Sequence, residues 1–230
     1  MKKNSTAVTA FYDRIAEEYD HQLTASDKQV RRVVSGVFRQ YIPRGNVLDF
    51  GGGTGLDLPW LLAGDYHVFF LEPSVNMRAI AKKAANVIAG INRPVFLEEH
   101  TDIRDWSSGS LPVLEKMNGV LADFAVLNCI AEPAIFFEKI ALVCERHCYI
   151  VACVIDARPR VLLKNHPVKA VMRGFLNGEI ITRHTFNGAC HETHIHFQKR
   201  FRAAYRRHFD FIAHLPVAAS DFALLILSKK

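Results

Sequence analysis

The sequence has no hydrophobic run long enough to cross a lipid bilayer. Its longest apolar stretches, such as residues 222–227, are far shorter than the roughly 20 residues that a membrane-spanning helix requires. The first six residues include two lysines, but the apolar segment of a secretory signal peptide does not follow them. We therefore expect a cytoplasmic protein with no membrane span.

Closely spaced cysteine pairs are also absent. The five cysteines have no C-x-x-C spacing, and most of them lie in apolar segments. Such cysteines are typically buried and reduced, and they rarely form a metal site or a redox pair. We accordingly predict no resident metal ion.

Acidic residues are scarce in the last third of the chain. Residues 156–230 carry 13 Lys and Arg against 5 Asp and Glu, a net charge of +8. Residues 1–155 carry 16 against 18, a net charge of −2. The basic part could attract an anionic substrate or a nucleic acid.

Apolar strand-like runs alternate with helical patterns through the first two-thirds of the chain, as in parallel βαβ units. We expect strands near residues 46–50, 67–72, 94–98, 118–123 and 148–154. We expect helices near residues 56–63, 74–85 and 132–145. The length of 230 residues and the 50% hydrophobic content suit a single domain that spans residues 1–230.

This alternation stops after residue 156. Residues 157–178 predict a basic loop and one short helix, and residues 180–197 alternate around Asn187-Gly188, a dipeptide typical of a type I′ hairpin turn. The remaining predicted elements are an Arg-rich helix near 198–208 and strands near 209–215 and 222–228. No helix separates these two strands, so they should pair in antiparallel fashion.

Positions 51–55 contain four glycines, at the end of the first predicted strand. Glycine has no Cβ atom, so the backbone of such a turn can adopt positive φ angles and approach a ligand closely. The segment fits the pattern D-x-G-x-G-x-G at Asp49, Gly51, Gly53 and Gly55. We expect a nucleotide-type cofactor to bind at this turn.

The alternative pattern is the G-x-G-x-x-G fingerprint of dinucleotide-dependent dehydrogenases, which requires a small residue at its third glycine position. Counting from Gly51 places Leu56 there, and counting from Gly53 places Leu58 there. Neither frame fits. The segment instead resembles the first motif of the class I S-adenosylmethionine-dependent methyltransferases.

The N-terminal residues 11–20, FYDRIAEEYD, extend this resemblance. They are similar to the N-terminal helix of the methyltransferases of the ubiquinone and menaquinone biosynthesis type. The resemblance covers about residues 10–155 well and residues 198–230 loosely. It implies a Rossmann-like α/β fold, in which a mostly parallel seven-stranded sheet has an antiparallel last strand and helices on both faces.

The same resemblance implies that residues 1–45 form a helical lid over the cofactor, with Tyr19 as a lid contact. The expected hairpin region, residues 157–197, matches no segment that we can assign. It would be an insertion after the fifth strand, where such enzymes usually determine substrate specificity.

The resemblance also implies that the cofactor is S-adenosylmethionine. The carboxylate of Glu72, at the end of the second strand, should accept hydrogen bonds from both ribose hydroxyls, although dehydrogenases place an acid similarly. Met77 should pack near the adenine, and Asp102 should accept from the adenine amino group, with Asp105 as a nearby competitor. The predicted cofactor contacts are Tyr19, Asp49, Gly51, Gly52, Gly53, Gly55, Glu72, Pro73, Met77, Asp102, Ile103, Asp123 and Phe124.

No residue is identified by the sequence as the catalytic base. Asp123 is expected at the carboxyl edge of the sheet, beside the transferred methyl group. His184 and His194 are further candidates, because four histidines gather on the predicted hairpin. His194 and His196 should share one strand face, and His184 could oppose them across the turn.

The favoured function is methyl transfer to a small-molecule acceptor. The Asn-Pro-Pro-Tyr type motif of DNA amino-methyltransferases and the Pro-Cys pair of cytosine-C5 enzymes are both absent from the sequence. One alternative is RNA methylation guided by the basic C-terminal third, including Lys199, Arg200, Arg202, Arg206 and Arg207. Another is a protein that binds the cofactor without turnover.

Overall fold

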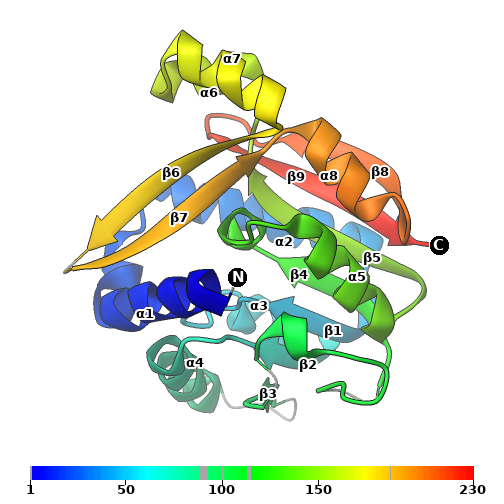
Figure 1. The fold of residues 1–230 in the computed structure, drawn as a ribbon. Coiled ribbons are helices and arrows are strands. Elements are labelled where there is room, and N and C mark those ends of the chain that lie inside the picture. The colour runs from blue at the N-terminus through cyan, green and yellow to red at the C-terminus, as the bar shows by residue number, and fades with distance from the viewer. Residues whose placement is uncertain (1, 89–92, 100, 113–114, 187) are drawn as a thin grey trace.

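Figure 1 presents the protein as a computed structural model, which describes residues 2–88, 93–99, 101–112, 115–186 and 188–230. In this part of the chain seven strands form one sheet, in the order β3-β2-β1-β4-β5-β9-β8. The strands are β1 (Arg44–Phe50), β2 (Asp65–Leu71), β3 (Val95–Leu97), β4 (Met117–Ala122), β5 (Cys144–Ile155), β8 (Phe209–Pro216) and β9 (Phe222–Lys229).

Strands β1 to β5 pair in parallel, and β9 runs antiparallel to both of its neighbours, β5 and β8. The expected sheet with an antiparallel last strand is therefore confirmed. The strand order reverses between β1 and β4. In open α/β sheets, ligands bind in the crevice beyond the carboxyl ends of the strands at such a reversal.

Helices cover both faces of the sheet (Figure 1). Successive residues of a strand point to opposite faces, so each face has its own core. Leu48 and Phe50 pack in one core, with aromatic residues of α5 (Pro133–Val143) and α8 (Gln198–Tyr205). Val47 packs in the other core, with side chains of α2 (Ala25–Tyr41), α3 (Leu58–Leu62) and α4 (Val75–Val87).

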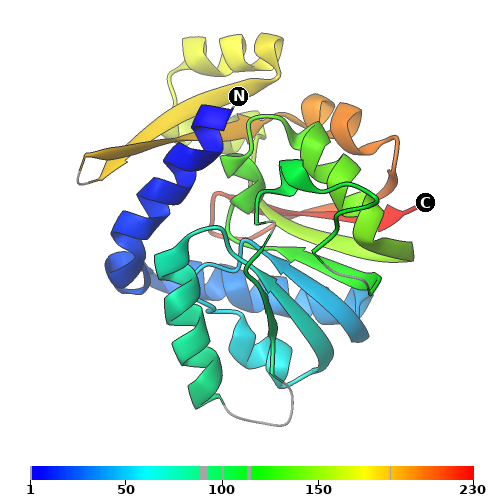
Figure 2. The same cartoon turned by 60° about the horizontal axis from the view of Figure 1, so that its bottom comes forward.

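The N-terminal helix α1 (Lys2–Tyr19) lies between α4 and the hairpin strand β7 (Figure 2). Phe11 and Ile15 of α1 contact a small core that includes Met77 of α4 and Ala189 of β7. Among the described residues, α1 and the short η1 (Asp20–Gln22) are the part of the predicted lid that contributes nothing to the two cores of the sheet. Helix α2, which the predicted lid also included, buries Val30, Val34 and Phe38 against the sheet instead.

The insertion between β5 and α8 contains more helix than the sequence indicated. Two helices occur, α6 (Pro159–Asn165) and α7 (Val168–Asn177), where one was expected. They are separate because Pro167 lacks an N–H group and holds His166 in an extended conformation, with φ −132° and ψ 141°.

The predicted hairpin follows, as β6 (Glu179–Phe186) and β7 (Ala189–His196) in a separate antiparallel pair. The predicted type I′ turn includes Asn187, which lies outside the described residues. In the described segments, no helix combines the length and hydropathy of a bilayer-crossing segment.

Candidate functional site

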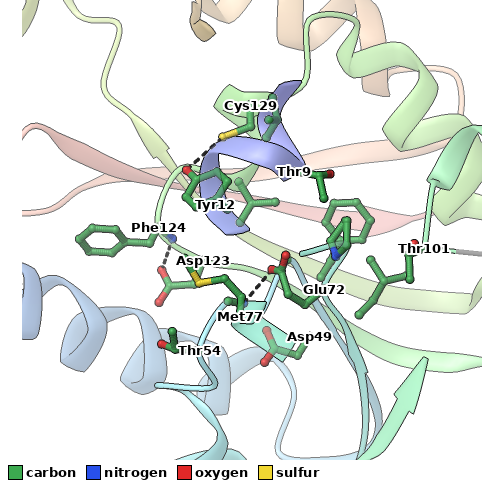
Figure 3. Close-up of a pocket in the computed structure, with 18 of the residues that line it drawn as sticks. Thr9, Tyr12, Asp49, Thr54, Glu72, Met77, Thr101, Asp123, Phe124 and Cys129 are labelled. Atoms are coloured by element: carbon green, nitrogen blue, oxygen red, sulfur yellow. Dashed lines mark hydrogen bonds between the residues drawn. The ribbon is translucent and has the colours of Figure 1, made fainter. Parts of the chain in front are cut away.

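A cavity of about 290 Å³ lies at the carboxyl ends of β1, β2 and β4, beneath the lid helix α1 (Figure 3). It occupies the place that the reversal of strand order predicts. Twelve of the thirteen predicted cofactor contacts line it, namely Tyr19, Asp49, Gly51, Gly52, Gly53, Glu72, Pro73, Met77, Asp102, Ile103, Asp123 and Phe124.

The glycine turn forms the floor of the cavity. Gly53 has a φ of +59°, and a Cβ atom built on it would meet nothing within 4 Å, so its free side faces open space. A Cβ atom on Gly52 would lie 2.2 Å from the ring of Phe70 and 2.7 Å from Oδ2 of Asp49. The turn therefore needs glycine at position 52 for packing and leaves room for a ligand at position 53.

Gly55 is the predicted contact that does not line the cavity. Its φ is +85°, and a Cβ atom there would lie 2.9 Å from the side chain of Leu58 and 3.1 Å from that of Ala81. The absence of a side chain at Gly55 therefore allows the turn to pack closely against α3 and α4.

The carboxylate of Glu72 is fixed at the end of β2 by backbone donors. It accepts hydrogen bonds from Gly53 N at 3.0 Å and from Ser74 N at 2.7 Å. Burial raises the pKa of Glu72 to about 7, against the lowering effect of these two N–H groups. A ligand that donates hydrogen bonds or carries positive charge would favour the ionised form.

Three buried aspartates surround one arginine on the other side of the turn. Arg31 Nη1 of α2 donates to Asp57 Oδ2 at 2.5 Å and to Asp123 Oδ2 at 3.2 Å. Burial raises the pKa of Asp123 to about 7 and raises the pKa of Asp49, with further contributions from neighbouring carboxylates. Asp49 Oδ2 and Arg31 Nε have no hydrogen-bond partner among the described residues.

The backbone that follows β4 adopts a rare conformation. Phe124 and Ala125 have φ values of 53° and 66°, which L-residues seldom adopt in succession. Asp123 Oδ1 accepts from Phe124 N at 2.7 Å, and Ala125 N donates to Cys153 O at 2.9 Å. These bonds hold Asp123 and Phe124 at the cavity wall, and strain of this kind often occurs at functional sites.

The lid helix is attached to the site by polar contacts. Asp13 Oδ1 accepts from Ser74 Oγ at 2.6 Å and from Asn76 N at 3.1 Å, and Asp20 Oδ1 of η1 accepts from Thr54 Oγ1 at 2.6 Å. In addition, the hydroxyl of Tyr12 lies 3.6 Å from Cys129 Sγ (Figure 3). Helix α1 and η1 are thus attached to the segments that follow β2 and β1.

The third strand is followed by η2 (Ile103–Asp105), where Asp102 and Ile103 reach the cavity. Asp102 caps this helix by accepting from Arg104 N at 3.0 Å, and its carboxylate also forms an ion pair with the Arg104 guanidinium. Asp105, the competitor for the adenine contact, does not line the cavity.

The histidine candidates lie away from the cavity. His184 pairs with His191 across the hairpin, and the two rings stack at 5.2 Å. His194 and His196 share the opposite face as expected, so His184 does not oppose them. Glu179 Oε2 lies 3.0 Å from Nδ1 of His194 and 3.5 Å from Nδ1 of His196. No group of three His, Cys, Asp or Glu in the described residues is arranged to hold a metal ion.

Thirteen of the residues that line the cavity were not predicted as site residues. Among them are Tyr12, Arg31, Thr54, Asp57 and Cys129. Thr54 and Asp57 belong to the glycine turn and its exit, so their proximity was available from the sequence. Arg31 and Cys129 come from segments with no recognisable motif, and only the packing of α2 and η3 (Val126–Cys129) brings them here.

Comparison with known sequences gives a short match. No protein-family model matches the chain. An uncharacterized methyltransferase of Bacillus pumilus is 35% identical over 77 residues, a segment that makes up 31% of this chain and 36% of that relative. The match thus spans about a third of either protein.

Solved structures match almost the whole chain. An S-adenosylmethionine-dependent methyltransferase of Clostridium acetobutylicum superposes with a TM-score of 0.65 at 8% identity, covering 96% of this chain and 98% of that one. The protein DhpI in complex with S-adenosylhomocysteine gives 0.69 at 14% identity, covering 97% and 96%.

The 1,6-didemethyltoxoflavin-N1-methyltransferase of Burkholderia thailandensis, with its substrate and S-adenosylhomocysteine bound, gives a TM-score of 0.66 at 12% identity, covering 98% of this chain and 88% of that one. At such identities the likeness concerns the fold. The chain therefore has the fold of the S-adenosylmethionine-dependent methyltransferases, as residues 47–55 led us to expect.

Proposed function

We propose that the protein binds S-adenosylmethionine in the cavity beneath α1 and transfers its methyl group to a small-molecule acceptor. The observation that carries this proposal is the charge of the cavity. Asp49, Asp57, Glu72, Asp102 and Asp123 contribute five carboxyl groups against one guanidinium, that of Arg31. The structures of similar fold that contain this cofactor or its product support the same conclusion.

This charge distinguishes between the two cofactor classes that a glycine turn suggests. The pyrophosphate of a dinucleotide is anionic and would be repelled by buried carboxylates at short range. S-adenosylmethionine carries a sulfonium and an ammonium group against one carboxylate, so it is a net cation. A cavity rich in carboxyl groups therefore favours the sulfonium compound.

The residues around the turn suit the amino-acid part of this ligand. Asp49 has a buried oxygen without a hydrogen-bond partner among the described residues, and it is available to the ammonium group. Arg31, with an Nε that has no hydrogen-bond partner among the described residues, is available to the carboxylate. Glu72 would accept from the ribose hydroxyls with its remaining lone pairs, while Met77 and Ile103 would pack against the adenine.

The cofactor, when bound, supplies an electrophilic methyl carbon that needs no covalent help from the protein. The task of this chain is then to align the acceptor and exclude water. The lid helix performs both functions, because Tyr12 and Val8 of α1 line the cavity on the side opposite the glycine turn. Cys129 and Ile130 form the wall nearest to the hairpin.

Calorimetry with S-adenosylmethionine, S-adenosylhomocysteine and NAD tests the proposal. We expect binding of the first two ligands and no binding of NAD. Tight binding of NAD without binding of either adenosyl compound would contradict the proposal. Transfer of label from the methyl-labelled cofactor to a metabolite in a cell extract would exclude a role without turnover.

RNA methylation remains the second candidate, and the basic surface of α8 is the observation that favours it. Within this surface Arg200 is already engaged, with Glu179 and the backbone oxygen of Ala131. Binding of RNA that weakens steeply as salt is added would support this candidate. Absence of binding at low ionic strength would rule it out.

A further inference from the structure

A second cavity, of about 170 Å³, adjoins the first at the lid. Val8 and Cys129 line both cavities, so the two cavities adjoin at these side chains. The outer wall comes from β7 and includes Cys190 and His191. This second space lies on the side of the cofactor cavity that the glycine turn and Glu72 do not occupy.

His191 is the notable group in this wall. Only 6% of the surface of this residue is exposed. Its Nδ1 has no hydrogen-bond partner among the described residues. The ring lies 4.3 Å from that of Phe11 and 5.6 Å from that of Tyr12, measured between centroids. The imidazole is thus fixed by the lid on one side and by His184 on the other.

We propose that the second cavity holds the methyl acceptor and that His191 takes the proton which an O–H or N–H acceptor loses on methylation. This inference rests on the proposed function. In the step, the acceptor oxygen or nitrogen bonds to the methyl carbon. The bond from that carbon to sulfur breaks, its electron pair stays on sulfur, and the acceptor proton passes to a ring nitrogen of His191.

Three other titratable groups near the cavity are unsuited to this role. Burial raises the pKa of the Cys129 thiol to about 11 and that of the Tyr12 hydroxyl well above its ordinary value, so both keep their protons near neutral pH. Glu192 is held by Arg183 at 2.9 Å. Burial and the neighbouring His184 and His194 lower the pKa of His191, so its ring is neutral and can accept a proton.

The shape and charge of this cavity indicate the class of acceptor. A dry cavity of about 150 Å³ holds one benzene ring, so this cavity suits a single-ring compound. Its two charged side chains, Arg183 and Glu192, pair with each other. The acceptor is therefore an uncharged, single-ring phenol or N–H heterocycle.

The test uses the full chain with S-adenosylhomocysteine bound, and a set of simple phenols, N–H heterocycles and aliphatic alcohols as probes. We expect phenols or heterocycles to bind and to shift the imidazole ¹⁵N resonances of His191. His191→Phe keeps the ring contacts and should weaken this binding at least tenfold. His67→Asn, at an exposed histidine of β2, is the matched control and should change nothing.

A second variant separates binding from proton transfer. His191→Asn should bind the probes within a few-fold of the wild type but lose about 10²- to 10⁴-fold in their methylation rate, the usual contribution of a general base. Its rate should also lose the part of the fall at acidic pH that we expect protonation of His191 to cause in the wild type.

Three outcomes would overturn the inference. They are the absence of any probe binding, unchanged binding by His191→Phe, and unchanged methylation by His191→Asn. Failure of the unmodified protein to bind S-adenosylhomocysteine would instead contradict the proposed function itself, so the two failures are distinguishable.

A different observation concerns α7, on the far side of the hairpin (Figure 1). Its residues Val168, Met172, Phe175 and Leu176 recur at helical spacing and are exposed, Leu176 to 84%. The buried face of the helix is instead formed by Val171 and Gly174. Large apolar side chains gathered on one exposed helix face indicate an interaction surface.

The charges around this surface identify the kind of partner. Residues 157–178 contain five Lys and Arg and no Asp or Glu. Lys169 and Arg173 follow the apolar residues Val168 and Met172 directly in the sequence, so they lie beside the apolar stripe on the helix. An apolar face bordered by basic residues is the pattern of helices that lie in an anionic membrane surface.

We infer that α7 docks on an anionic lipid bilayer, with the apolar stripe in the interface and the basic side chains among the headgroups. A second copy of the chain is disfavoured as the partner, because two identical basic surfaces would repel each other. This inference does not depend on the proposed function.

Sedimentation with vesicles tests this surface. The protein should bind vesicles of phosphatidylcholine mixed with phosphatidylglycerol at least tenfold more tightly than vesicles of phosphatidylcholine alone. The double variant Phe175→Ser and Leu176→Ser should lose this binding, and Val87→Ser, at an equally exposed apolar residue of α4, should retain it. Lack of vesicle binding, or a dimer that only the double variant disrupts, would overturn the inference.

Discussion

Glu72 is the single side chain on which cofactor affinity should depend most. Replacing it with glutamine puts an NH₂ group against one of two backbone donors, Gly53 N or Ser74 N, and removes the charge that would face the ribose in the proposed complex. A buried polar group left unpaired costs about 1–3 kcal/mol, which corresponds to about a 5- to 150-fold loss of affinity. Calorimetry with S-adenosylmethionine measures the affinity of Glu72→Gln, and Glu98→Gln, at an exposed glutamate, is the control. Equal affinities for both variants would contradict the assignment of Glu72.

The affinity for S-adenosylmethionine should depend on pH through the same carboxyl groups. Glu72 and Asp123 both have pKa values of about 7 in the unliganded protein, and a bound cation favours their ionised forms. Affinity should therefore be fully present above pH 7 and lost as the pH falls below it, by about tenfold at pH 6 for each group. Titrations between pH 6 and 7.5 measure this slope. Glu72→Gln should reduce it.

The stability of the unliganded protein should change in the opposite direction. Burial raises the pKa of Glu72 and of Asp123 above their ordinary values, so the folded state binds more protons than the unfolded state between about pH 4 and pH 7. The free energy of unfolding should then fall as the pH rises through this range. Denaturant titrations at pH 5 and pH 7.5 test the sign. A rise in stability over the range would show that other groups dominate.

At the scale of elements, the lid helix α1 should control how fast the cofactor leaves. Asp13→Ala removes the acceptor for Ser74 Oγ and Asn76 N, which connects α1 to the start of α4. A loss of about 1–2 kcal/mol in lid closure corresponds to a dissociation rate about 5 to 30 times higher. Displacement kinetics of S-adenosylhomocysteine measure the rate, with Glu17→Ala on the exposed side of α1 as control. Unchanged rates would mean that the lid does not open during release.

Sequence patterns predicted some helices and strands better than others. The strands before α5 and the start of α4 follow the predictions closely, because hydrophobic runs and helix starts are local signals. The prediction of a single helix in residues 157–178 was wrong, because the segment contains two helices. Pro167 was a visible signal for this division. The pairing of His184 with His191 follows from strand register, which depends on the turn.

For the whole molecule, ligand binding at the junction of β1, β2, β4 and the lid should stabilise the entire fold. Binding to the folded state alone contributes about 2.7 kcal/mol when the ligand is at 100 times its Kd. For a chain of this size that corresponds to a rise in Tm of about 5–10 °C. Thermal unfolding with S-adenosylmethionine should show this rise, and NAD should not. Equal shifts with both ligands would contradict the cofactor assignment.

The sequence by itself determined the class of fold, the position of the glycine turn and twelve of the residues that line the cavity. These features depend on local chemistry, such as the lack of Cβ atoms at Gly51 and Gly53 and the carboxylate at the end of a strand. Tertiary structure decided the rest, because Arg31 and Cys129 approach the site only through packing of distant segments. The same packing, rather than any motif, buries His191 beside the lid and leaves the apolar face of α7 exposed.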